Sequence, residues 1–224
     1  MAPGGCGANR PPWNSTMGHR ALIAYERSNG KYNLHYSHRG ALHLRLKSEL
    51  TPETPFGGDT VSKDVCDHFE ELIDREQEDV SDIDLATDKR VGTVVEIDPL
   101  ACNLSFDGIL TEHLDFLHYE ALYIVTSDFD ISAYRTLWLG LEYDCESITE
   151  SQTVSNGALR TVSWHDGEPI NDGYIQGEFH ALKSVVGDLV DRDVFGSEEA
   201  IEFMKEKLAQ WTSQREDLII QTPE

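Results

Sequence analysis

The dipeptide Asn29-Gly30 most constrains how this chain can fold, because it lies between two stretches of alternating apolar and polar residues. An Asn-Gly pair in that setting is the strongest short-range signal for a β-hairpin. A two-residue type I′ loop would pair Ser28 with Lys31 and Ala24 with His35. One face of the hairpin would then be apolar and the other polar. The apolar face would carry Ala21, Ile23, Tyr25, Leu34 and Tyr36, and the polar face Glu26, Lys31, Asn33, His35 and Ser37.

Apolar periodicity in the rest of the chain predicts further strands and helices. Strands are expected at 91–98, 121–126, 131–141 and 158–164, and helices at 60–74, 105–117, 177–190 and 197–213. The stretch 42–50 fits both a strand and a helix, and we favour the helix. This mixture predicts an α+β protein, with an antiparallel sheet that is opened by the N-terminal β-hairpin and flanked by amphipathic helices.

The length of 224 residues suits one domain with a proper core. We expect this single domain at 17–213, with the polar stretch 145–157 as the candidate for an internal boundary. Residues 1–16 are rich in Gly and Pro and predict a disordered leader, so Met17 is an alternative start of translation. The residues 214–224 are expected to form a loose tail.

The chain is strongly acidic, with 41 Asp and Glu residues against 18 Lys and Arg residues and a net charge of −23. This composition is typical of halophiles that keep molar salt in the cytoplasm, where charges are screened within about 3 Å. An ordinary acidic mesophilic protein is the alternative. No apolar run approaches the length of a membrane span, and the N-terminus lacks the apolar region of a signal peptide. We therefore expect a soluble, cytoplasmic protein with no membrane partner.

A basic region interrupts the acidic composition, because residues 17–47 carry six Lys and Arg residues and one acidic residue, Glu26. Such a region favours nucleic acid or another anion as the partner. For roughly five phosphate contacts, however, the rise to about 3 M salt costs on the order of a millionfold in affinity. A real anion site would therefore need bidentate arginine contacts. The alternative is that these cations pair with acidic residues of the same chain.

Familiar catalytic and cofactor signatures are absent from the sequence, including the P-loop, G-x-S-x-G and H-E-x-x-H patterns. We therefore predict no cofactor, and any active site would be assembled from dispersed residues. The candidates for acid–base catalysis are His35, Glu26, His165 and Asp166. The candidates for holding an anion or another ligand are Arg20, Arg39, Arg135 and Tyr25. Arg135 lies on the apolar face of its predicted strand and needs an acidic partner or an anionic ligand.

The pair His35 and His38 has the spacing of a metal-binding H-x-x-H motif, but residues three apart on a strand point to opposite faces. The two imidazoles could share an ion only if the strand ended at Ser37 and the chain turned there. The four cysteines are scattered and form no C-x-x-C pair, which argues against a zinc site or a disulfide framework. We expect no metal site.

Four short motifs resemble a family of uncharacterised proteins from halophilic archaea. They are Gly18-His19-Arg20-Ala21, His35-Tyr36-Ser37-His38, Thr54-Pro55-Phe56-Gly57-Gly58 and Tyr134-Arg135-Thr136-Leu137-Trp138. The resemblance covers roughly 17–142 and implies a haloarchaeal source and a domain that starts near Met17, but no activity. The predicted function is thus a binding or interaction module that uses the basic 17–47 region. The alternatives are a small hydrolase or other enzyme that acts on an anionic substrate, and a virus- or provirus-associated structural protein.

Overall fold

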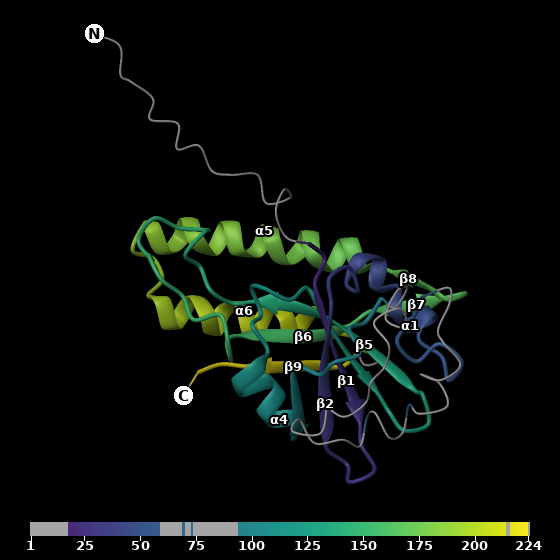
Figure 1. Ribbon diagram of the computed structural model, residues 1–224. Coiled ribbons are helices and arrows are strands. Elements are labelled where there is room, and N and C mark those ends of the chain that lie inside the picture. The colour runs from purple at the N-terminus through teal and green to yellow at the C-terminus, as the bar shows by residue number, and fades with distance from the viewer. Residues whose placement is uncertain (1–17, 59–68, 70–72, 74–93, 214–215, 224) are drawn as a thin grey trace.

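The structure is a computed structural model, and we describe residues 18–58, 69, 73, 94–213 and 216–223 of the chain (Figure 1). It contains helices and a mixed, mostly antiparallel sheet, which confirms the predicted α+β class. The predicted leader 1–16 and nearly all of the predicted helix 60–74 lie outside the described residues.

Seven strands of the described chain form the main sheet, in the order β3-β2-β1-β4-β5-β6-β9. They are β1 (Ala21–Glu26), β2 (Tyr32–Ser37), β3 (Ala101–Leu104), β4 (Ala121–Val125), β5 (Ile131–Trp138), β6 (Gly157–Thr161) and β9 (Leu218–Gln221). The central strands β1 and β4 run parallel, and the other neighbours are antiparallel. The short strands β7 (Ser163–His165) and β8 (Glu168–Ile170) form a separate antiparallel pair.

The strands β1 and β2 form a hairpin whose register differs from the predicted one by one residue. Ala24 pairs with Leu34 and Ile23 with His35. The reason is a three-residue loop, in which Gly30 adopts a left-handed φ of +75° and donates its N–H to the carbonyl of Arg27. This is a type I turn followed by a bulge. Because side chains alternate along a strand, the one-residue shift moves every side chain of β2 to the other face.

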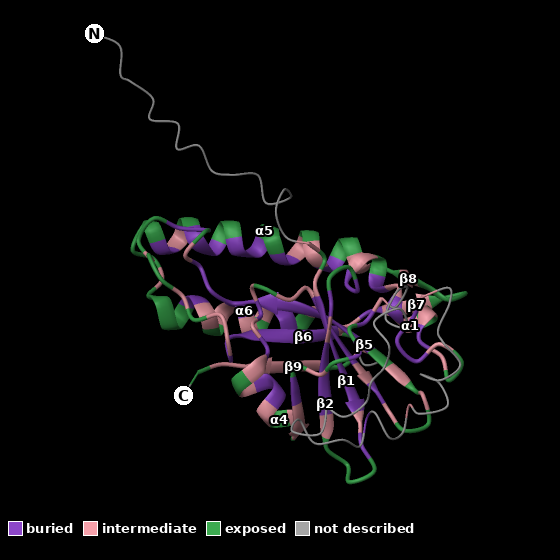
Figure 2. Cartoon of the chain, in the orientation of Figure 1, coloured by how far each residue is buried: buried purple, intermediate pink, exposed green. Residues whose placement is uncertain are grey.

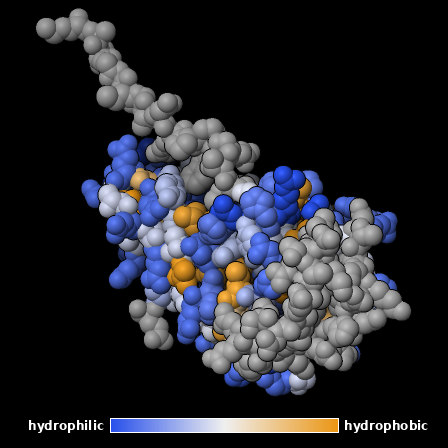
Figure 3. All heavy atoms as spheres, in the orientation of Figure 1, coloured by the Kyte–Doolittle hydropathy of each residue, from blue (hydrophilic) through white to orange (hydrophobic). Residues whose placement is uncertain are grey.

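Both faces of the sheet are buried, each by its own set of helices (Figure 2). The long helices α5 (Asp172–Asp191) and α6 (Ser197–Trp211) pack against the face that carries Ile23, Tyr123 and Leu137. A shorter segment, α4 (Phe106–Gly108) followed by the π-helix η4 (Ile109–His113), covers the face that carries Leu22 and Leu122. The described surface on the side shown in Figure 3 is mainly hydrophilic, with hydrophobic residues in small separate patches.

Several elements differ from the sequence-based expectations. The expected helix at 42–50 is split into the 3-10 turn η1 (Leu42–Leu44) and the short helix α1 (Leu46–Glu49). The described part of the expected strand 91–98 forms bends and no strand, and the neighbouring strand is β3, at Ala101–Leu104. Within the expected loose tail, Leu218–Gln221 is the edge strand β9. Three of its four residues are apolar, and it adds main-chain hydrogen bonds along β6.

Candidate functional site

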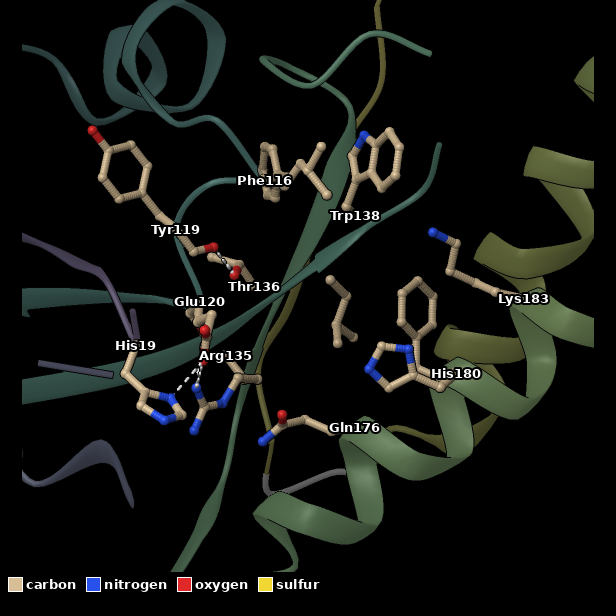
Figure 4. A pocket seen from close by; sticks show the side chains of 13 residues that line it. His19, Phe116, Tyr119, Glu120, Arg135, Thr136, Trp138, Gln176, His180 and Lys183 are labelled. Carbon is tan, nitrogen blue, oxygen red and sulfur yellow. Dashed lines mark hydrogen bonds and ion pairs between the residues drawn. The ribbon is translucent and has the colours of Figure 1, made fainter. Parts of the chain in front are cut away.

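A pocket of about 220 Å³ opens where β5, the segment 116–120 before β4, and helix α5 meet (Figure 4). Its wall combines apolar and aromatic side chains with five acidic or basic ones. The acidic and basic side chains are those of His19, Glu120, Arg135, His180 and Lys183. The deep part of the wall includes the buried side chains of Phe116, Leu137, Trp138 and Phe179. Ligand sites commonly combine an apolar wall with convergent polar groups, and this pocket has both, with polar residues in the majority.

Arg135 is fixed in the pocket wall by acceptors from three parts of the fold. Its Nε and Nη2 donate to the two carboxylate oxygens of Asp172, at 2.8 and 2.6 Å, in a bidentate ion pair. Nη1 donates to the main-chain carbonyl of Glu120 and Nη2 to that of Ala41, both at 3.2 Å. The Arg135 side chain is 4% exposed, so Asp172 at the start of α5 supplies its counter-charge inside the fold.

His19 and Glu120 form a second polar pair beside Arg135. The Nδ1 atom of His19 lies 3.1 Å from Oε2 of Glu120, and the same carboxylate oxygen lies 3.9 Å from Nη1 of Arg135. His19 precedes β1 and has a left-handed φ of +45°, a conformation that costs energy for a residue with a side chain. The carboxylate orients the imidazole through its Nδ1 atom.

Lys183 and His180 enter the pocket from α5, one turn apart. The Lys183 ammonium lies 3.0 Å from Oδ2 of Asp144 and 4.3 Å from the centre of the Trp138 ring. Burial lowers the pKa of Lys183, and the Asp144 carboxylate offsets part of that effect. The pKa of His180 is also lowered, first by burial and then by the charge of Lys183. Shifted pKa values in a cleft are characteristic of functional sites.

Of the residues predicted from the sequence, Arg135 lines the pocket and the others lie elsewhere. Tyr25 and His35 are buried in the core, where their rings pack edge to face at 5.1 Å. The Tyr25 hydroxyl donates to the carbonyl of Pro55, and Nδ1 of His35 contacts that of Glu96 at 2.9 Å. The core position of His35 follows from the register of the hairpin, which places it on the face of Ile23 and Tyr25.

The remaining predicted candidates are spread over the surface. Glu26 accepts a hydrogen bond from the main-chain N–H of Ser127, and Arg20 contacts the ring of His118. Arg39 is exposed. His165 and Asp166 lie together at the tip of the β7–β8 hairpin, with side chains 76% and 89% exposed. The structure therefore does not bring Arg20, His35, Arg39 and Arg135 into one concave cluster.

His38 is exposed and follows the last residue of β2, whereas His35 is buried within that strand. The His38 ring accepts or donates a hydrogen bond at 3.0 Å with the hydroxyl of Tyr36. Among the described residues, no group of three or more His, Cys, Asp or Glu side chains is arranged to hold a metal ion. None of the described helices has both the length and the apolar character needed to cross a membrane.

Four residues of the pocket, His19, Glu120, His180 and Lys183, were not predicted as site residues from the sequence. One available signal was the helical spacing of Gln176, His180 and Lys183, which places all three on one side of α5. No comparable signal marks Glu120, because it reaches Arg135 and His19 only through the pairing of β4 with β5 and β1.

Comparison with known families and structures gives one match. The model of a family of unknown function (DUF6735) matches residues 17–220. No curated protein and no solved structure matches the chain significantly. The resemblance noted in the sequence covered roughly 17–142, and the family match extends further along the chain. It includes α5 and therefore every residue that lines the pocket.

Proposed function

The chain belongs to this family of unknown function, whose description names no activity, and we propose from the pocket itself that the protein binds a small polar molecule between β5 and α5. The observation that carries the proposal is the convergence of Glu120, Arg135 and Lys183, from three separate elements, on one hollow with an aromatic wall. Burying a charged group costs free energy. Buried charged groups that line a cleft therefore often take part in binding or catalysis.

The size of the pocket limits the ligand. Sites for drug-sized molecules measure about 300–1,000 Å³, and a pocket of about 220 Å³ is smaller. The ligand is therefore a small metabolite, with an apolar part against Phe116 and Phe179 and polar groups towards His19 and Glu120. A nucleotide or oligonucleotide would not be enclosed.

The charges of the pocket indicate how the ligand is recognised. Asp172 balances Arg135 and Asp144 balances Lys183, while Glu120 contributes a further carboxylate. A ligand recognised only through its own negative charge would meet two cations that are already paired with carboxylates of the protein. We propose a neutral, zwitterionic or singly charged ligand, which uses Glu120 as a hydrogen-bond acceptor and Arg135 as a fixed positive charge.

A thermal-shift screen of the full chain in about 2 M KCl tests this proposal. The screen uses small aldehydes, ketones, amino acids, sugars and sugar phosphates, with nucleotides and short oligonucleotides beside them. We expect a compound of the small classes to raise the melting temperature of the wild-type chain. The rise should disappear in Glu120→Gln and persist in Glu112→Gln, a matched change at an exposed site. Stabilisation by oligonucleotides alone, unaffected by Glu120→Gln, would contradict the proposal.

Acid–base catalysis in the same pocket is a second candidate function, favoured by the 3.1 Å contact between His19 and Glu120. A carboxylate that orients an imidazole is the arrangement used for a general base. If the protein is an enzyme, His19→Asn would abolish turnover of the bound compound while its affinity changes by less than about threefold. Equal turnover by the variant and the wild-type chain would exclude His19 as the base.

The other predicted roles stay proposals. The net charge of −23 supports the proposal of a cytoplasmic protein adapted to high salt. Binding through the basic 17–47 region has less support, because several of its cations contact groups of the same chain. Arg20 contacts His118, Arg45 lies near Glu49, and Lys47 lies over the Trp164 ring. A virus- or provirus-associated structural role likewise stays a prediction.

A further inference from the structure

We propose that Lys183 reacts covalently with the ligand, as the amine that forms an imine with a small aldehyde or ketone bound in the pocket. This inference rests on the proposed binding function and adds to it a chemical class of ligand and a reactive atom. Amines that lie in a largely apolar site are the usual lysine nucleophiles towards carbonyl compounds.

Two contacts place the Lys183 amine at the inner wall of the pocket. The side chain leaves α5 and is 5% exposed, and its Nζ lies 4.3 Å from the centre of the Trp138 ring. Asp144 is 3.0 Å away and is itself 6% exposed. Trp138 and Phe179 line the pocket together with Lys183, so the amine and the apolar wall border the same space (Figure 4).

The position of Asp144 is set by the close packing of its backbone against α5. A side-chain carbon on Gly187, one turn after Lys183, would lie 2.1 Å from the carbonyl oxygen of Asp144, so only glycine fits there. Asp191, one further turn along α5, accepts hydrogen bonds from the N–H groups of Glu146 and Ser147 at 2.9 Å. These contacts hold the segment 144–147 against α5 and so keep the Asp144 carboxylate beside the Lys183 amine.

The chemistry requires Lys183 to lose its proton, and its surroundings make this easier than for an exposed lysine. Burial lowers the pKa of Lys183, although the carboxylates of Asp144 and Glu142 oppose this effect. His180 precedes Lys183 by one turn and also lines the pocket. Desolvation and Lys183 lower the pKa of His180, so its imidazole is more readily neutral and able to accept a proton in the pocket.

The reaction balances without an oxidant or a reductant. The neutral amine adds its electron pair to the carbonyl carbon, a C–N bond forms, and the oxygen takes up the proton that leaves nitrogen. The resulting carbinolamine accepts one proton on its hydroxyl group and loses water as the C–O bond breaks. The product is a protonated imine on Lys183, formed from one amine, one carbonyl compound and one proton with release of one water.

Reductive trapping on the full chain tests the inference. The protein in about 2 M KCl is treated with propionaldehyde and sodium cyanoborohydride, and peptide mass spectrometry follows secondary-amine formation at each lysine. We expect Lys183 to be labelled about tenfold faster than Lys205 and Lys207 of α6, which do not line the pocket, because the pocket holds the aldehyde next to the amine. Labelling of Lys183 at the rate of those two residues, or more slowly, would overturn the inference.

Two controls separate a pocket reaction from exposure of Lys183 by unfolding. Pyrene-1-carboxaldehyde is too large for a hollow of about 220 Å³ and should label Lys205 but spare Lys183. Equal labelling of Lys183 by both aldehydes would contradict a reaction inside the pocket. In Lys183→Arg the fast label should vanish, while a circular-dichroism melt checks that the fold persists.

The two proposals can fail separately. Binding of a small compound that depends on Glu120, together with slow labelling of Lys183, would leave the binding site in place and refute the imine. Fast labelling of Lys183 that is unaffected by an excess of the compound found in the screen would refute the common site.

Discussion

Polar side chains of β2 are buried on the core face of the sheet, and each is matched to a main-chain carbonyl. Asn33 donates to the carbonyl of Ile73 at 2.6 Å, Ser37 donates to that of Val94 at 2.7 Å, and His35 contacts that of Glu96. Unpaired polar groups in such positions cost roughly 1–3 kcal/mol each. These residues were predicted to lie on the polar face of the hairpin, with His35 as a catalytic candidate, and they instead attach other segments to the hairpin.

His35 should make stability depend on pH. Burial lowers its pKa from 6.5 to about 4, so the unfolded chain binds a proton that the folded chain does not. Stability is therefore lost as the pH falls from about 6.5 to 4, by up to about 3 kcal/mol from this residue. The free energy of unfolding from guanidinium titrations should fall less in His35→Gln than in the wild-type chain between pH 7.5 and 4.5. The exposed His165→Gln should keep the wild-type slope, and identical slopes for all three chains would disprove the assignment.

The Arg135–Asp172 pair should behave as a buried ion pair. Arg135→Met removes the cation that Asp172 pairs with inside the fold, together with one donor to each of two carbonyls, and should lower the free energy of unfolding by about 3–5 kcal/mol. The double variant with Asp172→Leu should recover part of this loss, because it removes the unpaired carboxylate. Glu202→Gln, which breaks the exposed ion pair with Lys205, should change the free energy of unfolding by less than about 1 kcal/mol. Additive losses in the Arg135 and Asp172 variants would contradict this account.

At the scale of elements, the register of the first hairpin depends on a single loop residue. The Asn29-Gly30 signal predicted a hairpin with a two-residue loop, whereas Ser28, Asn29 and Gly30 all lie between the paired residues Arg27 and Lys31. Both loops satisfy the same sequence signal, because each uses glycine at a left-handed position. The pattern alone could not choose between them, and the choice decided that His35 is buried.

Two glycine substitutions should have opposite effects on stability. Gly30 has a φ of +75° with open space around it, so Gly30→Ala should cost about 1 kcal/mol through backbone strain alone. Gly177 lies inside α5, also with open space around it, and Gly177→Ala should add about 0.5–1 kcal/mol. Guanidinium denaturation measures both changes. A stabilising Gly30→Ala would show that the loop has a different conformation.

Strand β9 should be necessary for a stable fold although the sequence analysis assigned it to a tail. It pairs with β6, and Glu216 just before it forms a buried ion pair with Arg160 at 2.9 Å. A chain that ends at Ser213 would leave Arg160 without that carboxylate, and its melting temperature should fall by about 10 °C. Removal of residues 222–224 alone should change it by less than about 2 °C. Equal melting temperatures for the two truncated chains would contradict a structural role for β9.

For the whole molecule, long periodic segments were predictable and the site was not. The stretches that became β4, β5, α5 and α6 have enough apolar residues at regular spacing to reveal their type. The pocket needs Glu120 just before β4, Arg135 on the neighbouring strand β5, and Lys183 on a helix far along the chain. Such long-range juxtaposition follows from the strand order, including the parallel β1–β4 pair, which no local pattern encodes.

The net charge of −23 should make the stability of the whole molecule depend on salt. Repulsion among surface carboxylates weakens as the screening length falls from about 10 Å at 0.1 M salt to less than 3 Å above 1 M. We expect the melting temperature to rise by about 10 °C or more between 0.1 and 2 M KCl. A melting temperature that stays constant over this range would show that charge repulsion is not a major term.

The central claim is that the ligand site is the pocket between β5 and α5 and not the basic hairpin. Amide hydrogen exchange of the full chain, with and without the compound that stabilises it most in the screen, tests the location directly. The account predicts slower exchange in peptides from 116–120, 131–138 and 172–183, and unchanged exchange at the hairpin loop around Gly30. Protection confined to the 17–47 region would contradict it.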